Sequence, residues 1–254
     1  MAVEVAAADL HVHTVVSACA EVEMIPPLIV RRALALGLKL IGIADHHSVE
    51  NAAAVARAAS CCGIRVWPGM EVETREEVHV LCLFEDLEAA LDWQALVWRH
   101  LPPLANREEF FGPQYVVDFR GDHLCTNQML LQTSLDLGFE EVLGLVADHG
   151  GLALPAHVDK PRSSLFANLG MIPQGCRLPG AEISRHVTAD EARRRFPQLR
   201  GVGLVQSGDA HRLGEMINST RLAVEGLTLA ELRLALGGEK GRGILLAPLP
   251  EADP

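Results

Sequence analysis

Six apolar stretches of this 254-residue chain end in, or begin with, a side chain that can bind a metal ion. Each divalent ion takes several nitrogen or oxygen ligands, so a site with several ions needs imidazoles and carboxylates from many strand ends. The pattern therefore favours a fold that gathers strand ends at one place, and it predicts a metal-dependent hydrolase. The six motifs are Asp9-Leu10-His11-Val12-His13, Asp45-His46-His47, Gly69-Met70-Glu71, Val78-His79, Ala156-His157 and Ser207-Gly208-Asp209-Ala210-His211.

Continuous apolar runs alternate along the chain with segments of helical periodicity. Residues 40–44 and 152–156 are typical of strands covered on both faces, whereas residues 25–36 and 139–147 have helical patterns. This alternation indicates parallel strands with helical crossovers, and most ligand candidates follow the apolar run, where (β/α) barrels build their active sites. A doubly wound sheet would feed its site from fewer strands. The sequence therefore predicts a (β/α) barrel.

His79 is an exception because it begins its apolar run. The chain must turn at residues 74–77 to bring the start of that strand to the same rim, so we expect a distorted barrel. Residues 1–254 show no linker-like change in composition and are predicted to form a single domain. Residues 102–128 are irregular and rich in Asn, Gln, Phe and Gly, and we expect either a lid over the barrel mouth or a structural insertion.

The charge balance limits the partners of the protein. Asp and Glu number 33 against 22 Lys and Arg, for a formal net charge of −11, which argues against an extended nucleic-acid interface or an anionic membrane as partner. Bound cations could still make one pocket locally positive. There is no signal-peptide pattern, no run of roughly 18 apolar residues, and no disulfide or zinc-finger spacing among the six cysteines. We therefore expect a cytoplasmic protein with buried thiols, and the oligomeric state stays open.

Taken together, the six motifs resemble those of the polymerase-and-histidinol-phosphatase (PHP) family, in the family's order, over roughly residues 7 to 225. The resemblance implies a distorted seven-stranded, TIM-like (β/α) barrel of the PHP type. It also implies phosphoesterase activity with two or three divalent ions, which would be zinc, manganese or iron.

Carried over by position, the resemblance also implies a ligand set. The first ion would be held by His11, His13, Glu71 and Asp209. Glu71 would bridge to a second ion that also takes His79 and His157. A third ion would use His46 and His211 with one further ligand near residue 18 or 19.

That further ligand is where the chain departs from its relatives. Family members commonly have Asp or His there, whereas this chain reads Ser17-Ala18-Cys19-Ala20. Cys19 lies six residues after His13, where some relatives have His. A thiolate binds zinc well and hard Mg²⁺ or Mn²⁺ poorly. Cys19 is therefore either a ligand of the third ion or a buried thiol beside a site that is empty or completed by water.

The implied mechanism follows from charge. Two close cations would supply hydroxide near neutral pH and neutralise the phosphoryl oxygens, so Glu71 and Asp209 would act in catalysis by holding them. The leaving group could be protonated by Asp45, by His47 or by metal-bound water, and the sequence does not choose. Asp45 could instead orient its neighbours, and His47, where the family often has Asn, could be a supporting residue.

Basic residues close to the ligand motifs are candidates for binding the substrate phosphate, although each could also be a solvated surface charge. They are Lys160, Arg162, Arg185 and Arg212. Glu182 and Asn127 are candidates for contacting a sugar or a base.

The predicted function is hydrolysis of a small phosphomonoester or nucleotide phosphate by metal-activated hydroxide. Histidinol phosphatase is one specific activity within the family, and a small phosphorylated molecule is the expected partner. Two alternatives stay open. One is a metal-binding or nucleotide-binding module without turnover. The other is an amide or ring hydrolase, a class that often bridges its ions with a carboxylated lysine where this chain has Glu71.

Overall fold

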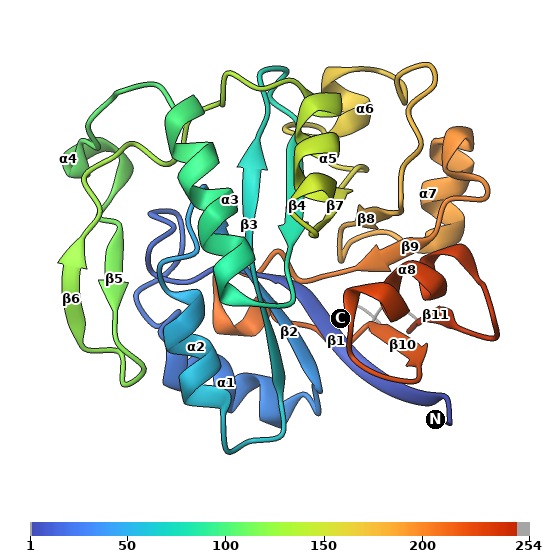
Figure 1. Ribbon diagram of the computed structural model, residues 1–254, viewed down its shortest axis with the longest axis horizontal. Helices are drawn as coiled ribbons and strands as arrows, with labels where there is room; N and C mark the ends of the chain where they lie inside the picture. Colours follow the sequence, from blue (N-terminus) through green and yellow to red (C-terminus); the bar gives the residue numbers. More distant parts are fainter. Residues whose placement is uncertain (1, 248–254) are drawn as a thin grey trace, which may run out of the picture.

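The computed structural model describes residues 2–247. Within them, seven strands form one curled sheet in the order β11-β10-β1-β2-β3-β4-β7 (Figure 1). The strands of this sheet are β1 (Glu4–Val12), β2 (Leu40–His46), β3 (Arg65–Glu73), β4 (His79–Leu83), β7 (Leu152–Pro155), β10 (Thr220–Val224) and β11 (Gly243–Leu246). Two short pairs lie outside it: β5 (Tyr115–Val117) with β6 (His123–Thr126), and β8 (Ala181–Ile183) with β9 (Leu204–Gln206).

Helices follow most of the strands. The longer ones are α1 (Pro26–Ala35), α2 (Ala52–Ala59), α3 (Leu87–His100), α5 (Phe139–Asp148), α7 (Ala189–Arg195) and α8 (Leu229–Gly237). The short ones are α4 (Glu108–Phe111), α6 (Leu165–Asn168) and the 3₁₀ turns η1 (Pro197–Leu199) and η2 (Leu213–Glu215). Pro26 begins α1, where the missing N–H costs nothing, and Gly37 with a φ of 70° follows its end.

Two hydrophobic cores lie on opposite faces of the curled sheet. In β2, Ile41 and Ile43 pack into the core beneath α1 and α2, whereas Leu40 and Ala44 belong to the second core with Trp67. Successive side chains of a strand point to opposite faces, so a strand buried on both faces must be apolar throughout. This explains the continuous apolar runs in the sequence.

The predicted turn before His79 is present. β1, β2 and β3 are parallel, but β4 pairs antiparallel with β3, and Glu73 is opposite His79. β7 is antiparallel to β4 and therefore runs in the direction of β3. The start of β4 thus lies at the same rim as the ends of its neighbours.

The barrel closes only at this rim. Val158 N donates to Glu182 O over 2.9 Å, which joins the end of β7 to β8. At the other side, His13 N donates to Ala210 O over 3.0 Å, and Ala210 N donates to His11 O over 3.1 Å, so the segment after β9 meets β1. In the described part of the chain, β1, β2, β3, β4, β7, β8 and β9 thus form a ring at their site-bearing ends. This is the distorted seven-stranded barrel predicted from the sequence.

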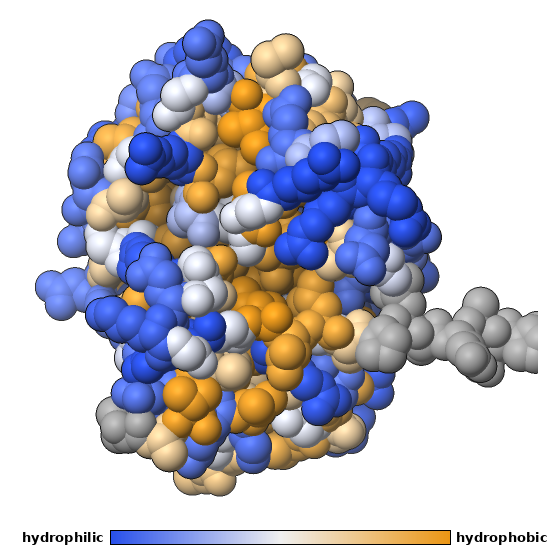
Figure 2. Space-filling view, turned by 90° about the vertical axis from the view of Figure 1, so that its right-hand side faces the viewer, coloured by the Kyte–Doolittle hydropathy of each residue, from blue (hydrophilic) through white to orange (hydrophobic). Residues whose placement is uncertain are grey.

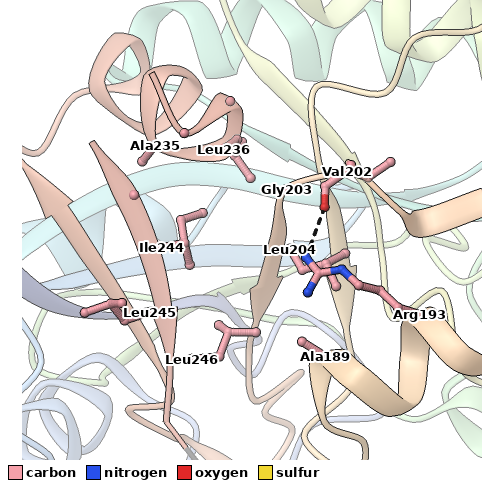
Figure 3. Close-up of a pocket in the computed structure, with 14 residues that line it drawn as sticks. Ala189, Arg193, Val202, Gly203, Leu204, Ala235, Leu236, Ile244, Leu245 and Leu246 are labelled. Atoms are coloured by element: carbon pink, nitrogen blue, oxygen red, sulfur yellow. Dashed lines mark hydrogen bonds between the residues drawn. The ribbon is translucent and has the colours of Figure 1, made fainter. Parts of the chain in front are cut away.

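The opposite end stays open in the described residues, because β10 pairs with β1 there and β11 lies on the far side of β10. A cavity of about 600 Å³ lies between β9, α8 and β11 (Figure 3). Figure 2 shows apolar side chains gathered in a hollow between hydrophilic flanks on this face. Among the described residues that line the cavity, Arg193 alone is charged, and it donates to Val202 O. None of the predicted ligands reaches this cavity.

Residues 102–128 contain α4 and the β5–β6 hairpin, which stands beside α2 and α3 at the edge of the molecule (Figure 1).

All six cysteines lie in the described part and are free thiols. Cys82 is buried, but Cys19, Cys61 and Cys125 are exposed, so the prediction of buried thiols is wrong for these three. Across residues 2–247, no helix combines the length and apolarity needed to cross a bilayer.

Candidate metal centre

The closed rim gathers most of the predicted ligands. Within the described residues, three groups have donor atoms that all lie within 4.8 Å of one another. The first group matches the ligand set implied for the first ion. The groups are His11, His13, Glu71 and Asp209; His46, Glu71 and His79; and His13, His46 and His211.

Glu71 lies between two sets of imidazoles. Its Oε2 is 3.5 Å from His11 Nε2 and 3.5 Å from His13 Nε2. Its Oε1 is 2.8 Å from His79 Nδ1 and 2.9 Å from His157 Nε2. The side chain is 1% exposed. Each oxygen therefore faces a different set of nitrogens, which is the geometry that a bridging carboxylate needs.

Asp209 completes the first set from the segment after β9, which lies beside β1. Its Oδ1 is 3.3 Å from His13 Nε2 and 3.6 Å from His11 Nε2. This oxygen is buried without a hydrogen-bond donor, whereas Oδ2 accepts a hydrogen bond from Lys160 Nζ. A buried carboxylate oxygen without a donor, beside converging imidazole nitrogens, fits a metal cation.

The third group consists of imidazoles. His13 and His211 stack with ring centroids 4.0 Å apart, and His46 lies 4.7 Å from His13. The Sγ of Cys19 does not belong to this group. Cys19 does line the pocket next to it, together with His211 and Asp209.

Opposite charges alternate across the centre. Burial raises the pKa of a carboxyl group, but the imidazoles of His79 and His11 hold the pKa of Glu71 well below its usual range. Burial lowers the pKa of an imidazole, yet Glu71 raises that of His79 to about 10. Burial lowers the pKa of His13 most, the nearby His211 lowers it further, and the result is a pKa of about 3. The buried carboxylates thus lie beside both protonated and neutral imidazoles.

Several of these residues occupy sharp turns. His47, His157 and Asp209 have φ values of 47°, 30° and 46°, in the left-handed region that L-residues rarely adopt. Such backbone costs about 1–3 kcal/mol per residue and persists only where the surroundings enforce it. In each case it turns the chain within three residues of a strand end, and at His157 and Asp209 it brings the side chain to the cluster.

Asp45 faces its neighbours rather than the cluster. It accepts hydrogen bonds from Thr14 N at 2.6 Å, Thr14 Oγ1 at 2.7 Å and Ser17 Oγ at 2.7 Å. Ser17 Oγ lies 3.0 Å from His13 Nδ1, so Asp45 orients His13 through Ser17. Burial raises the pKa of Asp45 to about 6. This geometry favours the orienting role over proton donation.

His47 is also occupied by structural contacts. Its Nδ1 lies 2.6 Å from Leu131 O, and its Nε2 accepts from Glu73 N over 2.9 Å. With both ring nitrogens engaged and the side chain buried, His47 fits a supporting role rather than that of a proton donor.

A pocket of about 330 Å³ adjoins the cluster, and three of the four predicted basic residues line it. These are Lys160, Arg185 and Arg212. Arg185 donates to Gly208 O and to Glu215 Oε1, and the exposed Arg212 lies 2.6 Å from Glu21 Oε1. Arg162 is exposed and does not line this pocket.

Ser184 and His186 also line this pocket, although they were not predicted as site residues from the sequence. Their position just after β8 was the available signal, because other strand ends carry site residues. Glu182 and Asn127 do not line the pocket: Glu182 is 1% exposed, and Asn127 donates to Glu50 over 2.7 Å.

Residues 9–163 match the PHP domain family. This chain belongs to that family. The match covers the motifs from Asp9 to His157, and the geometry above shows that the remaining motif, with Asp209 and His211, reaches the same rim.

The uncharacterized protein YqxK of Bacillus subtilis is 26% identical over 253 residues, which cover 94% of this PHP protein and 63% of YqxK. The lesion-specific endonuclease PfuEndoQ of Pyrococcus furiosus has a similar fold, with a TM-score of 0.70, 20% identity, and coverage of 95% of this chain and 58% of PfuEndoQ. A two-domain Bacteroides vulgatus protein containing a predicted PHP-like metal-dependent phosphoesterase gives a TM-score of 0.55 at 14% identity, over 96% and 65% of the two chains. The chain thus spans less than two thirds of the length of each of these three proteins.

Proposed function

We propose that this PHP protein is a metal-dependent phosphoesterase that hydrolyses a small phosphomonoester or a nucleotide phosphate. The observation that carries the proposal is the placement of Glu71, whose two carboxylate oxygens face two separate sets of imidazoles. Two cations that share one carboxylate stand close together, as phosphoester hydrolysis by two metals requires.

In this proposal His11, His13, Glu71 and Asp209 hold one ion, and Glu71, His79 and His157 hold the second. Bound there, the ions would lower the pKa of a water molecule and neutralise phosphoryl oxygens. His46 and His211 belong to the third position, where Cys19 is either a further ligand or a thiol beside the site.

The adjoining pocket supplies the groups that would hold the substrate. Lys160 and Arg185 present cations beside Asp209, and a guanidinium matches two phosphoryl oxygens at once. Phosphoryl transfer needs mainly positioning and charge stabilisation, so no nucleophilic side chain is required. Arg162, which lies outside the pocket, is left as a surface charge.

We also propose that residues 102–128 form a lid. Tyr115 N donates to Val15 O over 2.9 Å, and Val117 N donates to Asn51 Oδ1 over 2.9 Å. Asn51 in turn donates to Thr14 Oγ1 over 2.9 Å. The hairpin is therefore anchored to the loop that carries Ser17 and Cys19.

Metal content and turnover, measured on one preparation, test the function. We expect two or three ions per chain and hydrolysis of at least one substrate in a panel of phosphomonoesters and phosphodiesters. Glu71→Gln should release metal and abolish turnover, whereas Glu88→Gln on the exposed face of α3 should change neither. Full metal occupancy without turnover on any substrate would instead identify a binding module.

A second candidate substrate is a nucleic-acid phosphodiester, which the likeness to a lesion-specific endonuclease favours. The net charge of −11 predicts that any such binding is confined to the pocket, where few phosphates are contacted, so its affinity should fall only modestly with salt. Incision of a labelled duplex with one damaged nucleotide, compared with an intact duplex at two salt concentrations, separates this substrate from a small phosphomonoester.

A further inference from the structure

We propose that Glu182 is a positioning residue that fixes ligand imidazoles on both sides of Glu71, an inference that rests on the metal-dependent function proposed above. Glu182 lies in the middle of β8 and is 1% exposed. Its Oε2 is 3.0 Å from His11 Nδ1, and its Oε1 is 3.3 Å from the same nitrogen. The same Oε2 accepts the backbone N–H of His157 over 3.0 Å.

The contact with His11 determines which ring nitrogen carries the proton. A carboxylate can only accept, so Nδ1 of His11 must donate, and Nε2 keeps its lone pair when the ring is neutral. That Nε2 lies 3.1 Å from His13 Nε2 and 3.5 Å from Glu71 Oε2. Glu182 therefore stands behind the imidazole, on the side opposite the other donors. A carboxylate in that position fixes ring orientation and raises ligand basicity.

The contact with His157 holds the other side of the centre. His157 has a φ of 30°, a strained conformation that needs support from its surroundings. Glu182 gives that support twice, because its backbone oxygen also accepts Val158 N–H over 2.9 Å. With its backbone held, His157 directs Nε2 to Glu71 Oε1 at 2.9 Å. One residue of β8 thus couples His11 and His157, which face opposite oxygens of Glu71.

The interpretation of Glu182 as a sugar or base contact gives way to this role. Its carboxylate is closed off from solvent, and both oxygens are taken by His11 and His157. A buried carboxylate is costly unless charged or hydrogen-bonding partners compensate it. His11 and the backbone of His157 provide those partners, so Glu182 supports the metal ligands from behind.

The test compares three substitutions of Glu182 with one control. Gln keeps an acceptor oxygen for both contacts, Asp withdraws the carboxylate by one methylene, and Ala removes it. Asp159→Ala is the matched control, because Asp159 is a buried carboxylate on the loop that carries His157, and its oxygens accept from Ser184 N and Oγ, both over 2.6 Å. Each variant is titrated with zinc against a competing chelator, and the tautomer of His11 is read from long-range ¹⁵N–¹H spectra of the zinc-loaded protein.

We expect Glu182→Gln to bind zinc within a few-fold of the parent and to keep the proton of His11 on Nδ1. Glu182→Ala should lose about 10- to 100-fold in zinc affinity, the usual effect of removing such a partner. Glu182→Asp should lose affinity as well, and it provides the test if the Ala variant does not fold. Asp159→Ala should lower the melting temperature while zinc affinity stays within a few-fold.

Parent-like zinc affinity in both Glu182→Ala and Glu182→Asp would overturn the proposal. An equal loss in Asp159→Ala would also overturn it, since that result indicates general loosening of the loop. Neither readout requires turnover. A parent protein that binds zinc but hydrolyses nothing would refute the proposed function and leave the role of Glu182 to be decided by the titration.

Discussion

His79 and His13 show how neighbouring imidazoles acquire opposite properties at the rim. Glu71 Oε1 lies 2.8 Å from His79 Nδ1 and raises the pKa of His79 to about 10, although burial opposes it. Burial and, to a smaller extent, the nearby His211 lower the pKa of His13 to about 3. At neutral pH the metal-free centre therefore holds a protonated His79 and a neutral His13.

This difference predicts that metal binding releases protons. His79 must lose its proton before it can bind a cation, so zinc affinity should rise with pH below about 10, by about tenfold per pH unit for each proton released. Calorimetric titration in buffers of different ionisation enthalpy counts the protons. His79→Gln should release about one proton fewer than the parent, and an equal count in both proteins would contradict the assigned protonation.

Cys19 gives a second prediction at this scale. His13, His46 and His211 bring three nitrogens together without its sulfur, so we expect Cys19→Ala to keep the metal content of the parent. His211→Ala should lose about one ion per chain. Elemental analysis after dialysis measures both. A loss of one ion in Cys19→Ala would instead support the thiolate ligand predicted from the sequence.

At the scale of single elements, β1 depends on a glycine of its neighbour. The β1–β2 register shifts between Asp9 and Val12, so Leu10 lies in an irregular part of the strand that carries His11. A Cβ on Gly42 would come within 2.3 Å of Leu10 O. Only glycine lets the two backbones approach this closely, and β1 needs that approach to direct His11 and His13 into the rim.

Gly42→Ala should therefore destabilise the protein by about 1–3 kcal/mol and weaken zinc binding, because β1 must shift. Gly144, on the exposed face of α5 with no atom within 4 Å of its would-be Cβ, is the matched control. Gly144→Ala should be neutral or stabilise the helix by about 0.5–1 kcal/mol. Urea denaturation measures both changes, and equal stability of the two variants would refute the close-packing argument.

Element boundaries were predictable where periodicity was strong and invisible where it was not. The apolar run at residues 40–44 became β2, and the helical pattern at 139–147 became α5. Residues 102–128 have no such period and were predicted as irregular, yet they contain α4 and the β5–β6 hairpin. The exposed β6 has no alternating apolar pattern, because its pairing with β5 stabilises it without burying its side chains.

For the whole molecule, closure of the barrel at one rim ties the stability of the fold to the centre. Anionic Glu71 and Asp209 are buried among imidazoles. The ion pairs between these carboxylates and imidazoles connect β1, β3, β4 and the segments after β7 and β9. A ligand that binds only the folded chain stabilises it by mass action.

Chelation should therefore lower the melting temperature. Removing zinc held at about 100 times its dissociation constant costs about 2.7 kcal/mol, or about 5–10 °C for a chain of this length. Calorimetry with and without chelator measures the shift. Glu71→Gln should show little of it, and a parent protein whose melting temperature is indifferent to chelator would contradict a metal-supported rim.

The sequence by itself determined that strands alternate with helices, that their ends carry imidazoles and carboxylates, and that the order of motifs is that of the PHP family. These properties are local, since periodicity and motif spacing are written in neighbouring residues. Tertiary structure alone decided that Glu182 supports His11, that Asp45 reaches His13 through Ser17, and that both nitrogens of His47 are occupied. Each of these contacts joins segments that are far apart in the chain, or depends on how two strands pack together. The spacing of residues along one strand carries no information about such contacts.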